Sequence, residues 1–351
     1  MSTVKVSAEH SYEVLIGVSW KSEIAKVLQG RTRAALIVSE AMQSRLGDFA
    51  SSDTEIFTFT IPDGEAGKSS ATLLQVWNWL GAAGFTRNDL IVAIGGGATT
   101  DFGGYAAASW LRGIDWVAIP TTMAGMVDAA IGGKTAINSD YGKNLIGAFH
   151  SPTEVIIDFQ WLTTLSDRDF AAGLAEVVKA GFIADGAILD LMRGKKLAVL
   201  RKDQKVIEEL VTRAIAVKAK VVSTDFKESY AREALNYGHT LGHAIELESK
   251  FSLKHGECVA IGMAFMAHLQ EGLGLISSEL AQEHLEILQG LELPTSYKRQ
   301  SWPTLLANMS LDKKARGKAL RFVTITAIGK TDRLENPDEK LLLAAYEKVS
   351  S

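Results

Sequence analysis

The chain has 351 residues, of which 47% are hydrophobic and 22% charged, a composition typical of folded globular proteins. Its formal net charge of −4 argues against a nucleic-acid-binding surface, because phosphate backbones require an excess of basic residues. The single cysteine, Cys258, excludes an intrachain disulfide and a zinc site built from several thiolates. The length exceeds that of most single-core domains and predicts two domains.

Neither a secretory signal nor a membrane span is expected. Residues 1–14 mix charged and polar groups and lack the apolar run of a signal peptide. The uncharged stretch 258–267 is about half of the roughly 20 residues that crossing a bilayer requires. We therefore expect a soluble, cytoplasmic enzyme that binds neither membranes nor nucleic acids.

Residues 1–165 are predicted to form an α/β domain, because short apolar runs alternate there with helical segments such as 70–83. Strands interleaved with helices are typical of a parallel sheet that is covered on both faces. An added edge strand is expected around Val4 and Val6. The other predicted strands are 35–38, 56–61, 90–94, 116–119 and 154–158.

Residues 166–351 are predicted to form a mainly helical domain. No proline occurs between Pro152 and Pro294, and an interior proline would cost a helix about 3 kcal/mol. Ser166 and Asp169 have the spacing of a helix-capping box. The predicted helices are 166–183, 206–222, 259–273 and a terminal helix from 337, with one strand at 321–325.

A glycine-rich stretch, Gly95–Gly97, follows the predicted strand 90–94 and opens a helix. Glycines there permit positive φ and let backbone N–H groups approach a phosphate at a helix N-terminus. The dinucleotide-binding pattern G-x-G-x-x-G is broken, because Thr100 occupies its third glycine position. A phosphate-binding loop and a plain strand-to-helix turn therefore remain open interpretations. Lys134 follows the glycine pair Gly132-Gly133, and its cationic side chain is suited to binding a substrate oxyanion.

Four of the seven histidines lie between residues 239 and 268. Histidine is a common metal ligand and exchanges protons near neutral pH. His239 and His243 are four residues apart, so on a helix both rings lie on one face. Two polar residues on a solvated helix would have the same spacing. The pair indicates a metal site only if the chain supplies a third ligand.

Many short motifs occur in order between residue 63 and about residue 314. They are Gly95-Gly96-Gly97, Asp101, Arg112-Gly113, Pro120-Thr121-Thr122, Asp128, Gly132-Gly133-Lys134, Lys143-Asn144, Gly173-x-x-Glu176-x-x-Lys179, Arg232-x-x-Leu235-Asn236-x-Gly238-His239-Thr240-x-Gly242-His243-Ala244-x-Glu246 and His255-Gly256-Glu257. This ordered set resembles the 3-dehydroquinate synthase family of sugar-phosphate cyclases. The resemblance implies a Rossmann-like N-terminal domain that binds NAD and an all-α C-terminal domain that binds zinc or cobalt.

The family converts 3-deoxy-D-arabino-heptulosonate 7-phosphate into 3-dehydroquinate and phosphate, a step of the shikimate pathway of aromatic amino acid biosynthesis. NAD acts as a true catalyst in that family. A ring hydroxyl is oxidised, phosphate is eliminated, the ketone is reduced again, and the opened ring closes in an aldol step. The resemblance implies the same reaction here.

The resemblance also implies residue roles. Glu176, His239 and His255 match the family's metal ligands, and His243 matches a residue that transfers protons in the family and is not a ligand. Further catalytic candidates are Glu228, Lys134, Arg112 and Asn236. Arg112 matches a phosphate contact made across a homodimer interface. Substrate-binding candidates are Asp128, Lys134, Asn144, Lys179, Lys218, Arg232, Asn236, His243 and Lys314. Cofactor-binding candidates are Asp63, Gly64, Glu65, Lys68, Gly96, Gly97, Ala98, Thr99, Thr100, Asp101, Thr121, Thr122, Lys134, Lys143, Trp161, Leu162, Thr163 and Thr164.

Three alternatives remain. A related cyclase would use another sugar phosphate, although Lys143, Lys218, Arg232 and Asn236 favour an acidic substrate. A metal-dependent alcohol dehydrogenase of the same two-domain plan would release NADH, whereas a cyclase recycles it. A helical binding protein with a structural metal would usually supply four protein ligands. Ala98 and Thr100 depart from the family pattern in the glycine loop and put only its geometry in question.

Overall fold

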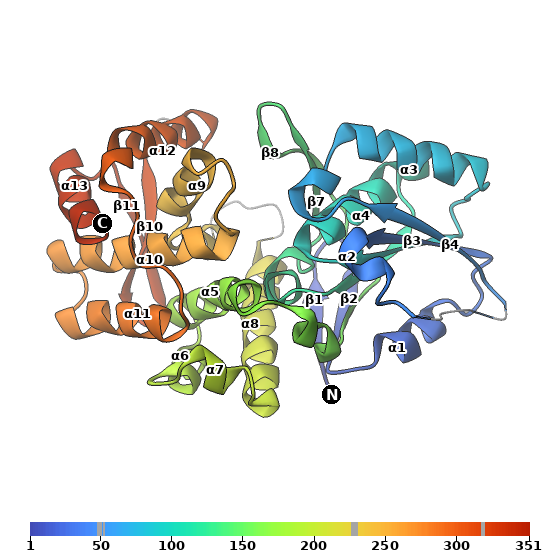
Figure 1. Cartoon of the computed structure of the whole chain (residues 1–351), viewed down its shortest axis with the longest axis horizontal. Helices are drawn as coiled ribbons and strands as arrows, with labels where there is room; N and C mark the ends of the chain where they lie inside the picture. The colour runs from blue at the N-terminus through green and yellow to red at the C-terminus, as the bar shows by residue number, and fades with distance from the viewer. Residues whose placement is uncertain (48–50, 52, 226–230, 317–319) are drawn as a thin grey trace. The chain divides into compact units, whose positions relative to one another are not determined.

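The computed structural model describes residues 1–47, 51, 53–225, 231–316 and 320–351, without the side chains of residues 231 and 311–316. The chain divides into two compact units (Figure 1). The first consists of Met1–Leu165 and Lys218–Phe226, and the second of Ser166–Val217 and Lys227–Ser351. None of the described helices combines the length and the apolar character that crossing a bilayer would need.

A seven-stranded sheet forms the centre of the first unit. Its strands are β1 (Ser2–Ser7), β2 (Ser11–Ile16), β3 (Arg33–Ser39), β4 (Glu55–Ile61), β5 (Leu90–Gly95), β6 (Asp115–Pro120) and β9 (Glu154–Ile157). They follow the order β1-β2-β9-β6-β5-β3-β4. Only the β1–β2 pair is antiparallel, and every other neighbouring pair is parallel.

The remaining elements of the first unit connect these strands. They are the helices α1 (Trp20–Val27), α2 (Glu40–Gln43), α3 (Ser70–Ala82) and α4 (Gly97–Ser109), the short turns η1 (Gly64–Gly67), η2 (Trp110–Arg112), η3 (Gly125–Ala129) and η4 (Phe159–Thr164), and the hairpin strands β7 (Lys134–Ser139) and β8 (Gly142–Phe149).

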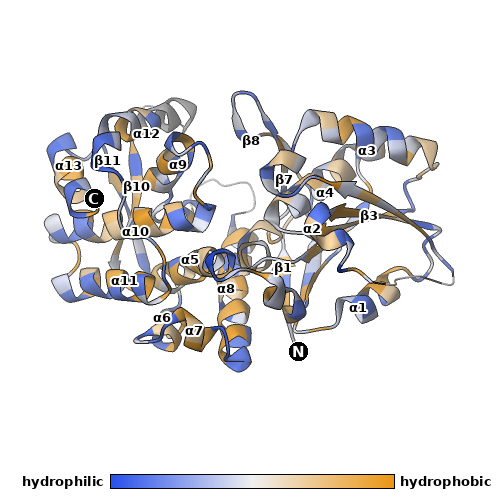
Figure 2. Cartoon of the chain, in the orientation of Figure 1, coloured by the Kyte–Doolittle hydropathy of each residue, from blue (hydrophilic) through white to orange (hydrophobic). Residues whose placement is uncertain are grey.

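The predicted parallel α/β sheet is confirmed. All five of the other predicted strands form, and the strand around Val4 and Val6 lies at the sheet edge. Strand β5 is buried along its whole length, as expected for a sheet covered on both faces, and Figure 2 shows the hydrophobic residues along β3. Strand β2 and the hairpin β7–β8 were not predicted.

The turn between β5 and α4 consists of the three consecutive glycines Gly95–Gly97. Glycine permits positive φ, but none of Gly95, Gly96 and Gly97 has one, and Gly96 is extended, with φ −69° and ψ 179°. Close packing requires glycine there instead. A Cβ on Gly95 would lie 2.5 Å from Thr99 Oγ1, and one on Gly97 would lie 2.8 Å from the Ala129 Cβ.

The second unit is mainly helical, as predicted, and adds one hairpin. Its elements are α5 (Asp167–Ile183), α6 (Gly186–Met192), α7 (Leu197–Leu200), most of α8 (Gln204–Thr224), η5 (Ala231–Asn236), α9 (His239–Glu248), α10 (His255–Gly272), α11 (Ser278–Gly290), η6 (Arg299–Ser301), α12 (Trp302–Arg316), α13 (Glu339–Lys348), β10 (Arg321–Ala327) and β11 (Lys330–Glu335). The predicted strand 321–325 forms β10, whereas its antiparallel partner β11 was not predicted. The predicted cap also forms, because Ser166 Oγ accepts a hydrogen bond from Asp169 N.

Helix α10 is the central helix of this unit and packs against α5, α9, α11 and α13 (Figure 1). Two of its glycines touch backbone atoms of neighbouring segments. A Cβ on Gly256 would lie 1.7 Å from the carbonyl oxygen of Ala172 in α5. A Cβ on Gly262 would lie 1.8 Å from the carbonyl oxygen of Gly238, directly before α9. Any side chain at either position would force α10 away from its neighbours.

We predict that Gly256→Ala lowers the free energy of unfolding by about 3 kcal/mol, because the helix pair must separate to admit the methyl group. Gly272→Ala in the same helix is the matched control, since a Cβ there meets nothing within 4 Å. The control should stay within about 1 kcal/mol of the unchanged protein. Urea unfolding followed by circular dichroism measures both, and equal stabilities of the two variants would contradict the close contact.

Candidate functional site

Three side chains from three helices of the second unit converge. Glu176 lies in α5 and is 3% exposed, while His239 and His255 are the first residues of α9 and α10. Nε2 of His255 lies 3.2 Å from Glu176 Oε1, and Nε2 of His239 lies 3.5 Å from the same oxygen. The ligand atoms of all three residues lie within 4.8 Å of one another. One carboxylate and two imidazoles therefore share one small volume.

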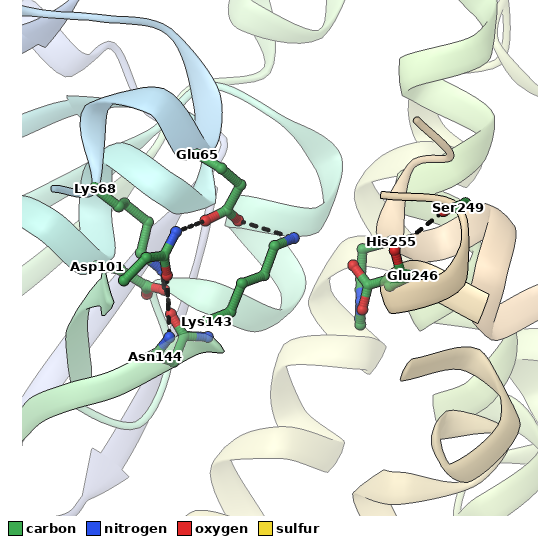
Figure 3. Close-up of polar contacts among 9 residues, drawn as sticks. Glu65, Lys68, Asp101, Lys143, Asn144, Glu246, Ser249 and His255 are labelled. Atoms are coloured by element: carbon green, nitrogen blue, oxygen red, sulfur yellow. Dashed lines mark hydrogen bonds and ion pairs between the residues drawn. The ribbon is translucent and has the colours of Figure 1, made fainter. Parts of the chain in front are cut away.

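Hydrogen bonds to the second ring nitrogen orient both histidines. Nδ1 of His239 lies 3.0 Å from the carbonyl oxygen of Tyr237, which can only accept, so Nδ1 carries a proton. Nδ1 of His255 lies 3.2 Å from Glu246 Oε2, and the backbone carbonyl of Glu246 accepts a hydrogen bond from Ser249 Oγ (Figure 3). Carbonyl and carboxylate partners of this kind orient histidines that bind metals.

Glu246 was not predicted to have a role in the site. Its position three residues after His243, within the same motif, was the only indication that it belongs to the cluster.

The electrostatics of the cluster depend on Glu176. Burial would raise its pKa, but the Lys179 ammonium and the two imidazoles hold the pKa well below its ordinary value. Burial and Lys179 lower the pKa of His239. Burial also acts to lower the pKa of His255, yet the carboxylates of Glu176 and Glu246 beside its ring raise that pKa to about 10. A positive charge between the two carboxylates is therefore strongly favoured.

The donor set fits a divalent cation. Both carboxylate oxygens of Glu176 are buried, and within the described part of the chain neither accepts a hydrogen bond of good geometry, although Lys179 forms an ion pair with one of them. One carboxylate and two imidazoles with positions left for substrate are typical of catalytic zinc, whereas structural zinc is usually closed by four protein ligands.

His243 lies one helical turn after His239. The centroids of these two rings are 5.2 Å apart, and His243 is 6.0 Å from His255 by the same measure. His243, Glu246 and His255 also form a group whose ligand atoms lie within 4.8 Å of one another. His243 thus borders the Glu176 group without belonging to it.

Some of the other predicted substrate residues of the second unit are buried, and some lie outside the described residues. Lys179 is buried beside Glu176, and Arg232 is buried in η5, which also contains Asn236. Glu228 lies outside the described residues, as does the side chain of Lys314.

In the first unit, the predicted cofactor and substrate residues form a hydrogen-bonded network (Figure 3). The buried Lys68 ammonium donates to Asp101 Oδ2 at 2.7 Å and to Asn144 Oδ1 at 2.5 Å. Burial raises the pKa of Asp101, and Lys68 opposes this shift. The Lys143 ammonium lies 3.5 Å from Glu65 Oε1. The network thereby joins η1, α4 and the β7–β8 hairpin, which also carries Lys134.

Two other predicted residues of the first unit, Lys218 and Asp128, form a further ion pair. The Lys218 ammonium donates to both the backbone carbonyl and Oδ1 of Asp128. Thr121 lies against the glycine turn and donates its N–H to Gly95 O at 2.8 Å, with Thr122 next to it.

The predicted cofactor residues in η4 differ from one another. The side chains of Trp161 and Leu162 belong to the core, and the Trp161 ring packs against Trp20. The hydroxyls of Thr163 and Thr164 donate to backbone carbonyls within η4. Asp63 accepts a hydrogen bond from Ala41 N at the start of α2.

Comparison with known proteins identifies the family. Two family models match consecutive parts of the chain, 3-dehydroquinate synthase N-terminal over residues 58–172 and 3-dehydroquinate synthase C-terminal over residues 173–315. The 3-dehydroquinate synthase of Pseudarthrobacter chlorophenolicus is 47% identical over 350 residues, which cover 98% of this chain and 96% of the relative. That of Mycolicibacterium vanbaalenii is 45% identical over 355 residues and covers 99% and 98%.

Solved structures agree with the predicted fold class. The 2-epi-5-epi-valiolone synthase from Streptomyces hygroscopicus, which has NAD+ and Zn2+ bound, matches with a TM-score of 0.89 and 26% identity over 99% of this chain and 98% of that one. A 2-deoxy-scyllo-inosose synthase complexed with carbaglucose-6-phosphate, NAD+ and Co2+ matches with a TM-score of 0.87 over 99% and 100%, and its 23% identity shows the fold alone. The family models and the identity to full-length relatives together show that the chain belongs to the 3-dehydroquinate synthase family.

Proposed function

We propose that the protein is a 3-dehydroquinate synthase that converts 3-deoxy-D-arabino-heptulosonate 7-phosphate into 3-dehydroquinate and phosphate. NAD and Zn2+ or Co2+ are its cofactors, and it acts in the shikimate pathway in the cytoplasm. The convergence of Glu176, His239 and His255 carries the proposal. It occurs in a chain that is 47% identical to a relative of that name over nearly its full length.

Residues 166–351 form the metal- and substrate-binding domain in this proposal, with Glu176, His239 and His255 holding the metal. A divalent cation there would lower the pKa of a substrate hydroxyl and polarise the ketone formed from it, while NAD would accept and return a hydride. His243, one turn from His239, exchanges protons at the ring-opening and aldol end. Glu228 is the second proton acceptor.

Residues 1–165 form the NAD-binding domain. Backbone N–H groups at the start of α4 provide the positive end of a helix dipole for the pyrophosphate. The Lys68–Asp101–Asn144 network supports this assignment, because it fixes the hairpin that carries Lys134 and Lys143. The cationic and amide side chains assigned to the substrate bind its carboxylate, hydroxyls and phosphate through charge-assisted hydrogen bonds. They are Lys134, Asn144, Lys179, Lys218, Arg232, Asn236 and Lys314, with Asp128 holding Lys218.

We also propose a homodimer in which Arg112 contacts the phosphate bound by the neighbouring subunit. Leu111 and Arg112 have φ values of +50° and +67°, a conformation rare in residues with a side chain. Such strain is typical of functional positions. Arg87 holds the strained turn by donating two hydrogen bonds to Leu111 O.

The expected product distinguishes this function from its alternatives. Purified protein supplied with heptulosonate phosphate, NAD and Zn2+ should release phosphate and 3-dehydroquinate in equal amounts without accumulating NADH. A related cyclase would form no dehydroquinate from this substrate. A dehydrogenase would accumulate NADH in proportion to turnover. Phosphate release measured with a coupled dye, product identification by mass spectrometry and absorbance of NADH separate the three outcomes.

The metal assignment predicts different effects for two neighbouring histidines. His239→Ala should lose the metal and turnover together, because it removes one of three protein ligands. His243→Ala should keep one metal per chain while turnover falls about 100-fold or more, the usual contribution of a general acid–base residue. Metal content by mass spectrometry and steady-state kinetics measure both effects. Loss of metal from the His243 variant would mean that the ligands are wrongly assigned.

The dimer assignment predicts complementation between two inactive variants. In a refolded equimolar mixture of Arg112→Ala and His239→Ala chains, half of the dimers are mixed, and each mixed dimer has one complete site. Activity should therefore recover to about a quarter of the unchanged level, since subunits of a twofold dimer contribute symmetrically. No recovery, in a mixture shown to contain mixed dimers, would place Arg112 in its own subunit's site.

A further inference from the structure

Two residues before His239, Tyr237 belongs to a buried network of hydrogen-bonded side chains that has no part in the proposed reaction. Tyr237, Gln270 and His284 are all fully buried, and they belong to the segment before α9, to α10 and to α11. Gln270 Nε2 lies 3.0 Å from Tyr237 Oη, and Tyr237 Oη lies 2.9 Å from His284 Nε2. Burying three polar side chains is unfavourable unless each is fully hydrogen-bonded, so a satisfied network of this kind specifies one arrangement.

The direction of every hydrogen bond in this network is determined. Nδ1 of His284 lies 2.7 Å from the carbonyl oxygen of Leu280 and therefore carries the proton. Burial lowers the pKa of His284 to about 4, so its Nε2 is an acceptor at neutral pH. The Tyr237 hydroxyl must then donate to His284 and accept from the Gln270 amide. Gln270 Oε1 in turn accepts from Ile325 N in β10.

Ring stacking also holds this network of side chains in place. The His284 ring stacks on Phe182 of α5, with ring centroids 3.5 Å apart and planes 6° from parallel. The Tyr237 side chain is thus tied to α10 and α11 by hydrogen bonds, and through His284 to α5. A tyrosine with one donor and one acceptor at fixed positions has one favourable orientation.

The backbone of the same tyrosine leads to the proposed metal ligand. Tyr237 O accepts the hydrogen bond from His239 Nδ1 at 3.0 Å. Gly238, between them, has φ +78°, and a Cβ on it would lie 2.8 Å from the Met263 side chain. The carbonyl that orients His239 is therefore held on one side by contact with α10 and on the other by the anchored phenol.

We infer that Tyr237 is a positioning residue for His239, and that Gln270 and His284 act through it by fixing the carbonyl that orients the His239 ring. The inference rests on the proposed function, because it takes His239 as a metal ligand. Within the part of the chain that the structure describes, the hydroxyl is hydrogen-bonded to His284 and Gln270, neither of which belongs to the Glu176 group. Its effect is on the affinity and the coordination geometry of the bound cation.

Tyr237→Phe tests this inference, because it removes the hydroxyl and keeps the ring. We expect the dissociation constant for Zn2+, measured by competition with a chelating dye, to rise about 10-fold or more, as for other outer partners of metal ligands. The visible absorption of the Co2+-substituted protein should change in shape, since it reports ligand geometry. Gln270→Met, which leaves Tyr237 intact, should change both measurements in the same direction and serves if Tyr237→Phe does not fold.

Tyr346→Phe is the matched control. Tyr346 is also a buried tyrosine of the second unit, and its hydroxyl donates at 2.6 Å to Lys298 O, away from the histidine cluster. This variant should lose stability while its Zn2+ affinity stays within about twofold, because distant sites behave independently. An unchanged Zn2+ affinity and Co2+ spectrum in Tyr237→Phe, or equal weakening in Tyr346→Phe, would overturn the inference.

His239→Ala distinguishes this outcome from failure of the proposed function. If His239→Ala binds Zn2+ as tightly as the unchanged protein, the metal site itself is wrongly assigned. If His239→Ala loses Zn2+ and Tyr237→Phe does not, only the positioning role fails.

Discussion

The backbone contact between α10 and its neighbours is the constraint on which the group of Glu176, His239 and His255 depends. Gly256 sits against Ala172 of α5, and Gly262 sits against Gly238 before α9. His255, at the start of α10, reaches Glu176 only because Gly256 lets the first turn of the helix touch α5. The Glu176 carboxylate and the His255 imidazole, 79 positions apart in the sequence, therefore come into contact because residue 256 is a glycine.

A buried carboxylate needs a compensating charge, and the surroundings of Glu176 provide it in several ways. Taking an ion out of water costs several kcal/mol even after relaxation, and a single missing partner would leave that penalty uncompensated. Lys179 supplies one positive charge, and a proton on His255 supplies a second between Glu176 and Glu246. A divalent cation at the same place would replace that proton. The protein therefore holds Glu176, His239 and His255 together without a cation, which would reduce the reorganisation that binding one requires.

Sequence patterns predicted the parts of the fold in which one strong property dominates. The apolar runs of β3 and β5 were found because both strands are buried on both faces. Strand β2 was missed because Ser11 and Glu13 interrupt its apolar residues, and their exposure at the sheet surface is visible only once the strand is paired. In the metal group, spacing alone favoured His239 with His243. The structure instead groups His239 with Glu176 and His255, which lie on two other helices, so only the ordered motifs of a family could indicate them.

The broken glycine pattern has a structural explanation that the sequence alone could not supply. In dinucleotide-binding folds the third glycine allows the helix to pack closely on the strand. Here Thr100 occupies that position, where it is buried and its hydroxyl donates to Gly97 O at 2.9 Å. Close helix–strand contact occurs three residues later, at Gly103, where a Cβ would lie 2.5 Å from the Ala93 Cβ in β5. The function of the missing glycine is thus carried by Gly103, and Thr100 is no argument against a phosphate at the start of α4.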